Sequence, residues 1–147
     1  MKTPNLLILF VLAILMSCTS KPKNPIEGTW NLVSFKWTFP DSTFLEYPGN
    51  VAACSGKFML LDSNSLWYFR YKPNNDSAYI IEFGDVKFKF DGKTYQETYQ
   101  SAQDDKFIGL TFHYDVSINN DTLTLSGPGE GESDELGCVV VEKFVRE

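Results

Sequence analysis

The sequence predicts an all-β domain, an antiparallel up-and-down barrel of about eight to nine strands. Apolar and polar residues alternate along much of the chain, as they do in strands that bury one face. Turn-forming residues separate these stretches at short intervals, and no convincing helical periodicity follows Ile26. A meander of this kind can close by pairing its last strand with its first, which removes the exposed edges of the sheet.

The strands follow one another with short connections. They are expected at residues 30–39, 57–61, 66–71, 79–83, 86–90, 94–100, 108–118, 122–126 and 137–145. The stretch 108–118 has the clearest alternation, with apolar or aromatic residues at its even positions and small or polar residues at its odd positions. Turns are expected at residues 62–64, at Gly84 and Asp85, at the Asp-Gly pair 91–92 and at residues 119–121.

The N-terminus has the features of a secretory leader. Lys2 precedes an apolar run from Leu6 to Met16, which is shorter than the roughly 20 residues that a membrane-spanning helix needs. The run ends in Ser17-Cys18 and resembles the lipobox of bacterial lipoproteins. The resemblance implies cleavage before Cys18 and acylation of that cysteine, for instance with palmitate. The alternative is an ordinary secretory peptide with an incidental cysteine.

Three segments follow from this interpretation. Residues 1–17 are the expected lipoprotein signal peptide, 18–25 a lipidated tether, and 26–147 the barrel domain. Thr19 is not the aspartate that often marks inner-membrane retention, so an outer-membrane lipoprotein of a Gram-negative cell envelope is expected. The tether is basic, whereas surface-exposed lipoproteins of some groups carry acidic residues there. This difference favours the periplasmic face over the cell surface.

Composition excludes several function classes. The net charge is −6, which speaks against a nucleic-acid partner. His113 is the single histidine, which disfavours metal and catalytic sites built from several histidines. We therefore expect no metal, no cofactor and no enzymatic activity. Four carboxylates could each act as a lone acid, but nothing in the sequence places them together: Glu46, Glu82, Glu97 and Asp115.

Four stretches resemble one protein family. Gly28-Thr29-Trp30 is similar to the Gly-x-Trp signature of lipocalins, and its surroundings, IEGTWNLVSF, resemble the start of lipocalin-like domains in bacterial lipoproteins. The stretches FDGKTYQETY, INNDTLTLSG and VVVEKFVRE resemble later strands of those domains. The resemblance implies a small barrel in which Trp30 plugs the closed end. Arg146 loosely matches the basic residue that often stacks over this tryptophan.

Aromatic side chains supply candidate ligand contacts. Tyrosine and tryptophan combine apolar area with a polar group, which suits an apolar or amphipathic ligand. The candidate ligand-binding residues are Trp67, Phe69, Tyr71, Phe88, Tyr99, Phe112 and Tyr114. The alternative is that these rings fill the barrel completely, because protein interiors pack tightly.

Two further features concern covalent chemistry. Cys54 and Cys138 either form a disulfide, which would stabilise by about 4 kcal/mol in the chain-entropy model, or stay free thiols. Ser42, Ser77 and Thr122 each follow an aspartate and precede a methyl-bearing residue, which is similar to an acceptor pattern for bacterial O-glycosylation. The same pattern also favours plain turns. The acidic loop 127–135 lacks the EF-hand spacing and is expected to be solvated rather than to bind calcium.

Two non-enzymatic functions are favoured at this point, and an enzyme that uses the barrel cavity is the weakest of three hypotheses, because the sequence shows no nucleophile–base pair or metal spacing. The leading hypothesis is a non-enzymatic, outer-membrane-anchored lipoprotein whose barrel binds a small hydrophobic or amphipathic molecule. The alternative is an interaction module with a filled barrel that docks an unidentified protein of the cell envelope.

Overall fold

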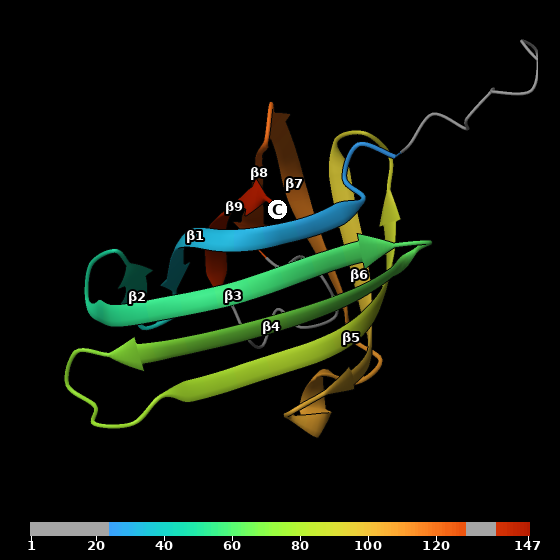
Figure 1. Ribbon diagram of the computed structural model, residues 1–147. Helices are drawn as coiled ribbons and strands as arrows, with labels where there is room; N and C mark the ends of the chain where they lie inside the picture. Colours follow the sequence, from blue (N-terminus) through green and yellow to red (C-terminus); the bar gives the residue numbers. More distant parts are fainter. Residues whose placement is uncertain (1–23, 129–137) are drawn as a thin grey trace, which may run out of the picture.

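A closed antiparallel β-barrel is seen in the computed structural model, which describes residues 24–128 and 138–147 (Figure 1). Its strands are β1 (Gly28–Thr38), β2 (Phe44–Tyr47), β3 (Val51–Leu61), β4 (Asn64–Pro73), β5 (Ile80–Phe90), β6 (Thr94–Ala102), β7 (Thr111–Asn119), β8 (Thr122–Pro128) and β9 (Val139–Arg146). From β3 to β9 each strand pairs with the next, and β1 pairs with both β3 and β9. Eight strands therefore close the barrel and β2 is an addition, which confirms the predicted all-β, up-and-down fold.

The observed strands correct the sequence prediction at Gly84. Residues 79–83 and 86–90 were expected to be two strands separated by a turn at Gly84 and Asp85, but residues 80–90 form the single strand β5. Gly84 lies opposite Trp67 of β4, and a Cβ atom on Gly84 would lie 2.8 Å from the indole of Trp67. This glycine makes room for a neighbouring ring and does not turn the chain.

Two elements were not predicted. The short strand β2 follows a turn in which Ser42 has a positive φ. A 3-10 helix, η1 (Asp105–Phe107), precedes β7, so that β7 begins at Thr111 and not at Ile108. The side chain of Asp104 caps η1 by accepting a hydrogen bond from the backbone N–H of Lys106.

The other three predicted turns are confirmed. Asp62 and Ser63 connect β3 to β4, and both have positive φ, as a two-residue type I′ hairpin requires. Between β5 and β6, Gly92 has a φ of 99°, and the carboxylate of Asp91 accepts hydrogen bonds from the backbone N–H groups of Lys93 and Thr94. Asn120 supplies the positive φ between β7 and β8.

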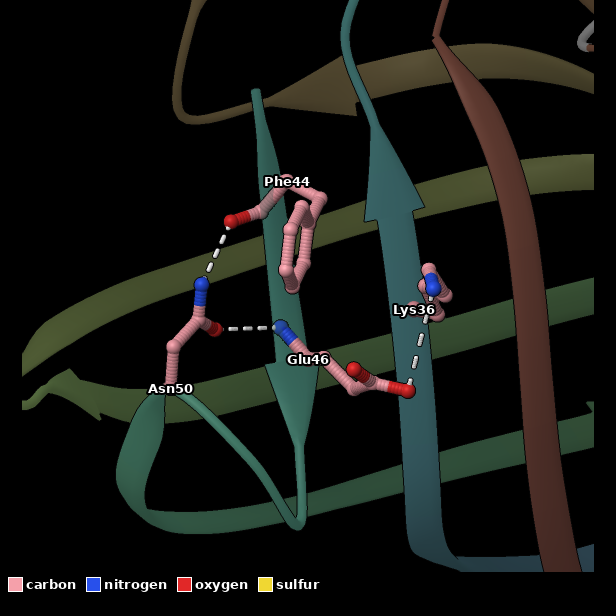
Figure 2. A network of polar contacts seen from close by, with 4 residues as sticks. All are labelled: Lys36, Phe44, Glu46 and Asn50. Atoms are coloured by element: carbon pink, nitrogen blue, oxygen red, sulfur yellow. Dashed lines mark hydrogen bonds and ion pairs between the residues drawn. The ribbon is translucent and has the colours of Figure 1, made fainter. Parts of the chain in front are cut away.

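The strand β2 pairs with the second half of β1, on the edge whose first half pairs with β3. The side chain of Asn50 makes two hydrogen bonds to the backbone of β2, both of 2.7 Å (Figure 2). Its amide nitrogen donates to the carbonyl of Phe44, and its amide oxygen accepts from the backbone N–H of Glu46. Lys36 of β1 lies 4.0 Å from the Glu46 carboxylate across the pair. The Glu46 side chain therefore lies on the outer surface beside Lys36 and does not reach the barrel interior.

A register shift in β1 redirects its side chains. The pairing with β9 is interrupted between Leu32 and Ser34, which leaves Val33 as an extra, exposed residue. Before the shift the even-numbered Trp30 points inward, and after it the odd-numbered Phe35 and Trp37 do. Such a bulge lets one strand serve both ends of a barrel with apolar side chains.

One end of the barrel is packed solid. Its side chains are almost completely buried and include Trp30, Leu60, Tyr95, Leu123 and Phe144. The indole of Trp30 donates a hydrogen bond of 2.8 Å to the carbonyl of Ile26, which precedes β1 and closes this end. The Arg146 guanidinium lies 4.0 Å above the Trp30 ring and donates to the carbonyls of Pro25 and Glu27.

Candidate functional site: a cavity with three carboxylates

The opposite half of the barrel contains a cavity of about 550 Å³. It lies where β1 and β6 end and where β5, β7 and β9 begin, with η1 beside it. The cavity lining includes four residues at this end of the barrel: Phe39, Ile80, Ala102 and Cys138. Among the described residues, the packed end adds Phe58 and Phe144 to the lining. The barrel is thus filled at one end and hollow at the other, so neither alternative for the aromatic residues describes the whole interior.

Aromatic rings form most of the cavity wall. Six of the seven predicted candidates line it: Trp67, Phe69, Tyr71, Tyr99, Phe112 and Tyr114. Phe88, the seventh, is buried in the packed end against Tyr95, with 5.6 Å between ring centroids, and does not line the cavity. Six further aromatic residues that were not among the candidates also line it: Phe39, Phe58, Phe83, Phe144, Trp37 and Phe107. The rings pack mainly in tilted and edge-on pairs, the arrangement that aromatic quadrupoles prefer.

Strand alternation decides which side chains reach the cavity. On β7, Phe112 is buried and Tyr114 half-buried, while His113 and Asp115 are exposed on the outer face. On β4, Phe69 and Tyr71 are buried, whereas Arg70 lies outside with its guanidinium 3.8 Å above the Tyr79 ring. The predicted inward faces of these two strands are confirmed, and His113 is not part of the interior.

Three carboxylates from three different strands also line the cavity. They are Glu82 of β5, Glu97 of β6 and Glu142 of β9. Glu97 accepts hydrogen bonds from the hydroxyl groups of Tyr95 at 3.0 Å and Tyr114 at 3.3 Å. The remaining two each accept one, Glu82 from the Tyr71 hydroxyl at 3.0 Å and Glu142 from the Trp37 indole at 2.8 Å. All four donors are uncharged.

Burial makes these carboxylates hold protons more strongly than usual. It raises the pKa of Glu97 to about 7, and the hydrogen bonds from tyrosines oppose this only in part. Burial also raises the pKa of Glu142 to about 7, with a further contribution from the negative charges of Glu97 and Glu82. The pKa of Glu82 is raised in the same direction by burial, with Tyr71 and Lys106 acting against it.

Glu82 and Glu97 were named from the sequence as single acids with no prediction that they meet, and Glu142 was not named. Glu97 alternates with Tyr95 and Tyr99, so its inward direction was readable from the pattern of β6. The inward direction of Glu142 could not be predicted, because three consecutive valines at 139, 140 and 141 show no alternation along β9. Glu46 and Asp115 lie on the outer surface and do not join the group. The barrel closure brings β5, β6 and β9 around one space, which no local pattern specifies.

The two cysteines are free thiols and half-buried. Burial raises the pKa of Cys54 to about 11, and the negative charge of Glu142 adds to the shift. The same two causes raise the pKa of Cys138, which lies in the cavity wall. The structure therefore contains no bond between them, and the raised pKa values keep both thiols mainly protonated at neutral pH.

The remaining predicted positions lie outside the cavity. Ser42 and Ser77 are exposed in loops, where an enzyme could reach them, whereas Thr122 is half-buried at the start of β8. Cys18 and the acidic segment 129–135 fall outside the described residues. Within residues 24–128 and 138–147, no group of three or more His, Cys, Asp or Glu could hold a metal ion. In the same part of the chain, no helix has the length and apolarity to cross a membrane.

Neither a protein-family model nor a curated protein sequence matches this chain. The described residues define an eight-stranded antiparallel barrel with an added strand and an acidic, aromatic cavity at one end.

Proposed function

We propose that this chain is a lipocalin-like lipoprotein of the cell envelope whose barrel binds a small amphipathic molecule. The observation that carries the proposal is the cavity of about 550 Å³ with aromatic walls and a few convergent polar groups. Small-molecule sites have typical volumes of roughly 300–1,000 Å³ and this same mixture of apolar wall and few polar groups. The packed half around Trp30 supplies a rigid base for such a site.

A binding protein accounts for the interior better than an enzyme does. A hydrolytic nucleophile needs a base within hydrogen-bond reach, and His113 lies on the outer face while the thiols of Cys54 and Cys138 are protonated. The carboxylates accept hydrogen bonds from tyrosine and tryptophan side chains in the described interior. That arrangement fixes the polar groups in place, as selective binding requires.

Ligand binding is tested with protein purified from its own host. Native mass spectrometry is expected to show a co-purifying small molecule that dissociates on unfolding. An apolar fluorescent probe is expected to bind the emptied barrel and to quench tryptophan emission, because Trp37 and Trp67 lie in the wall.

Phe112→Ala enlarges the cavity and is expected to change probe affinity. His113→Ala, one residue along on the outer face, is the matched control. Equal affinity of the two variants and wild type would refute the site.

The anchor is tested separately. We propose that the chain is cleaved before Cys18, acylated there and held at the periplasmic face of the outer membrane. The expected result is that Cys18→Ala leaves the protein unprocessed or releases it from membranes. A mutant that fractionates and migrates like wild type would show that this cysteine carries no lipid.

An exposed apolar surface favours a second function. Met59 and Leu66 are paired across β3 and β4, and Tyr68 and Phe83 across β4 and β5, and all four side chains are exposed on the outer face. Contiguous apolar patches of this kind often mark protein interfaces. The alternative function is therefore docking to an envelope protein. Met59→Lys together with Leu66→Lys would disrupt such docking and leave probe binding unchanged, because neither side chain lines the cavity.

A further inference from the structure

We infer that the ligand of this cavity is an organic cation, an amine or ammonium group carried on an apolar body. The inference rests on the proposed binding function and names the chemical class of the ligand. Its basis is the juxtaposition of Glu82, Glu97 and Glu142 around one space with aromatic walls.

The cavity has an excess of acidic over basic groups. Lys106 is the single basic side chain among the described residues that line it. Its amine lies 2.7 Å from the carboxylate of Asp104, with which it forms an ion pair, and it lowers the pKa of Glu82 only as the smallest of three contributions. Within the described part of the chain, Glu82, Glu97 and Glu142 have no basic side chain in hydrogen-bond contact. A buried carboxylate without a cation is costly, and a cationic ligand would remove that cost.

The carboxylates also have unused acceptor capacity. An ionised carboxylate offers about four lone-pair sites. Glu82 and Glu142 each accept one side-chain hydrogen bond, and Glu97 accepts two. An ammonium group has about three donors and can bridge carboxylates from different strands. Ligand carboxylates or phosphates would instead meet three negative groups.

The walls favour the same ligand. Aromatic faces attract cations, by about 0.5–2 kcal/mol or more as the site becomes drier. Trp37, Trp67 and Tyr99 present such rings beside the acids, and Phe69 and Phe112 offer apolar area for the body of the ligand. Each wall component therefore recognises one part of a cationic amphiphile.

Protonation of the empty site gives the inference a second signature. The raised pKa values mean that Glu97 and Glu142 are partly protonated near pH 7 in the free protein. A bound cation would lower these pKa values, so that binding releases protons. Other titratable groups face the cavity from each neighbouring element: Tyr71 from β4, Tyr99 from β6, Tyr114 from β7, Cys138 before β9, and Asp104 and Lys106 around η1. The pKa values of Tyr99 and Tyr114 lie well above 10, so these phenols stay neutral over the same range.

The test compares three probes with the same octyl chain: octylammonium, octanol and octanoate. Isothermal titration calorimetry of the full chain is expected to give at least about tenfold tighter binding of octylammonium than of octanol, and the weakest binding for octanoate, near pH 8. Octylammonium affinity is expected to rise between about pH 6 and pH 8, while octanol affinity stays level. In buffers of different ionisation enthalpy, octylammonium binding at pH 7 is expected to release protons and octanol binding to release none.

Variants locate the effect. Glu97→Gln is expected to reduce octylammonium affinity at least about tenfold and to leave octanol affinity within about twofold. Glu46→Gln is the matched control, because Glu46 lies on the outer surface. If Glu97→Gln fails to fold, as judged by circular dichroism, proton release by the wild-type protein decides in its place.

The outcomes separate the two proposals. If none of the three probes binds, the proposed binding function fails and takes the inference with it. If octanol binds as tightly as octylammonium, or octanoate binds more tightly, the barrel is a binding protein but its ligand is not a cation. Octylammonium binding without proton release also overturns the inference.

Discussion

The indole nitrogen of Trp37 donates a hydrogen bond of 2.8 Å to the carboxylate of Glu142, joining the first and last strands of the barrel inside its cavity. The bulge at Val33 makes this contact possible, because without it Trp37 would face outward. A hydrogen bond from a neutral donor favours the ionised carboxylate and offsets part of the pKa increase that burial causes.

Removal of this donor is expected to shift the titration of Glu142. Trp37→Phe keeps a ring in place but lacks the N–H group, so the pKa of Glu142 should rise above its value of about 7. Carboxyl carbon NMR shifts followed through a pH titration measure this directly. Asp91, whose carboxylate accepts backbone hydrogen bonds in an exposed turn, is the internal control and should titrate as in wild type. An unchanged Glu142 would mean that the hydrogen bond does not form in solution.

Stability is expected to fall as pH rises from about 5 to about 8. The pKa values of Glu97 and Glu142 are raised from 4.5 to about 7 in the folded state, so the folded protein binds more protons than the unfolded chain in this window. The free energy of unfolding therefore decreases with pH, by up to roughly 3 kcal/mol for each group. Urea denaturation at several pH values tests this, and Glu97→Gln should flatten the slope. A urea midpoint that rises between pH 5 and pH 8 would contradict the expected loss of stability.

Much of the fold was readable from the sequence because strand alternation and turn chemistry are local. The hairpins at Asp62-Ser63 and Asp91-Gly92 and the inward face of β7 follow from such signals. Gly84 misled the prediction because a glycine is both a turn former and the residue that accommodates a neighbouring ring. Only the pairing of β4 with β5, which is not local, decides between the two roles.

The candidate site was predictable in its aromatic part and not in its acidic part. Alternation alone places Phe69 and Tyr71 on one face, which the cavity then shares. The meeting of Glu82, Glu97 and Glu142 depends on the closure of β1 against β9 and on the register shifts within the barrel. Phe88 shows the same limit, because alternation fixes its direction but not its depth along the barrel.

Cys54 and Cys138 are expected to behave as slow thiols. Burial and the nearby Glu142 raise the pKa of Cys54 to about 11 and that of Cys138 in the same direction, so little thiolate is present at pH 8. Iodoacetamide should modify both slowly in the folded protein and rapidly after unfolding in urea. Prior reduction should not change the number of sites modified. A pair of linked peptides seen without reductant would instead show a disulfide.

The packed end is expected to depend on both Trp30 and Arg146. Trp30→Ala removes a completely buried ring and should cost roughly 3–5 kcal/mol of unfolding free energy. Arg146→Lys removes the guanidinium that stacks on Trp30 and donates to two backbone carbonyls, and should cost about 1–2 kcal/mol. Lys143→Ala, on the exposed face of the same strand, should change stability by less than about 0.5 kcal/mol. Chemical denaturation compares the three, and a loss below about 1 kcal/mol for Trp30→Ala would exclude its role as a plug.

The contact between Gly84 and Trp67 gives a last prediction. A Cβ atom on Gly84 would lie 2.8 Å from the indole of Trp67, so Gly84→Ala should push the ring into the cavity and destabilise the fold by roughly 1–3 kcal/mol. The sign of this stability change is informative, because replacing glycine by alanine at an unstrained position normally stabilises a protein by about 0.4–1 kcal/mol. Trp67→Phe supplies a smaller ring and removes an indole N–H that is buried without a partner in the described structure. The double variant should therefore lose less stability than the sum of the two single losses. Additive losses, or a Gly84→Ala variant as stable as wild type, would show that the ring does not occupy the space above Gly84.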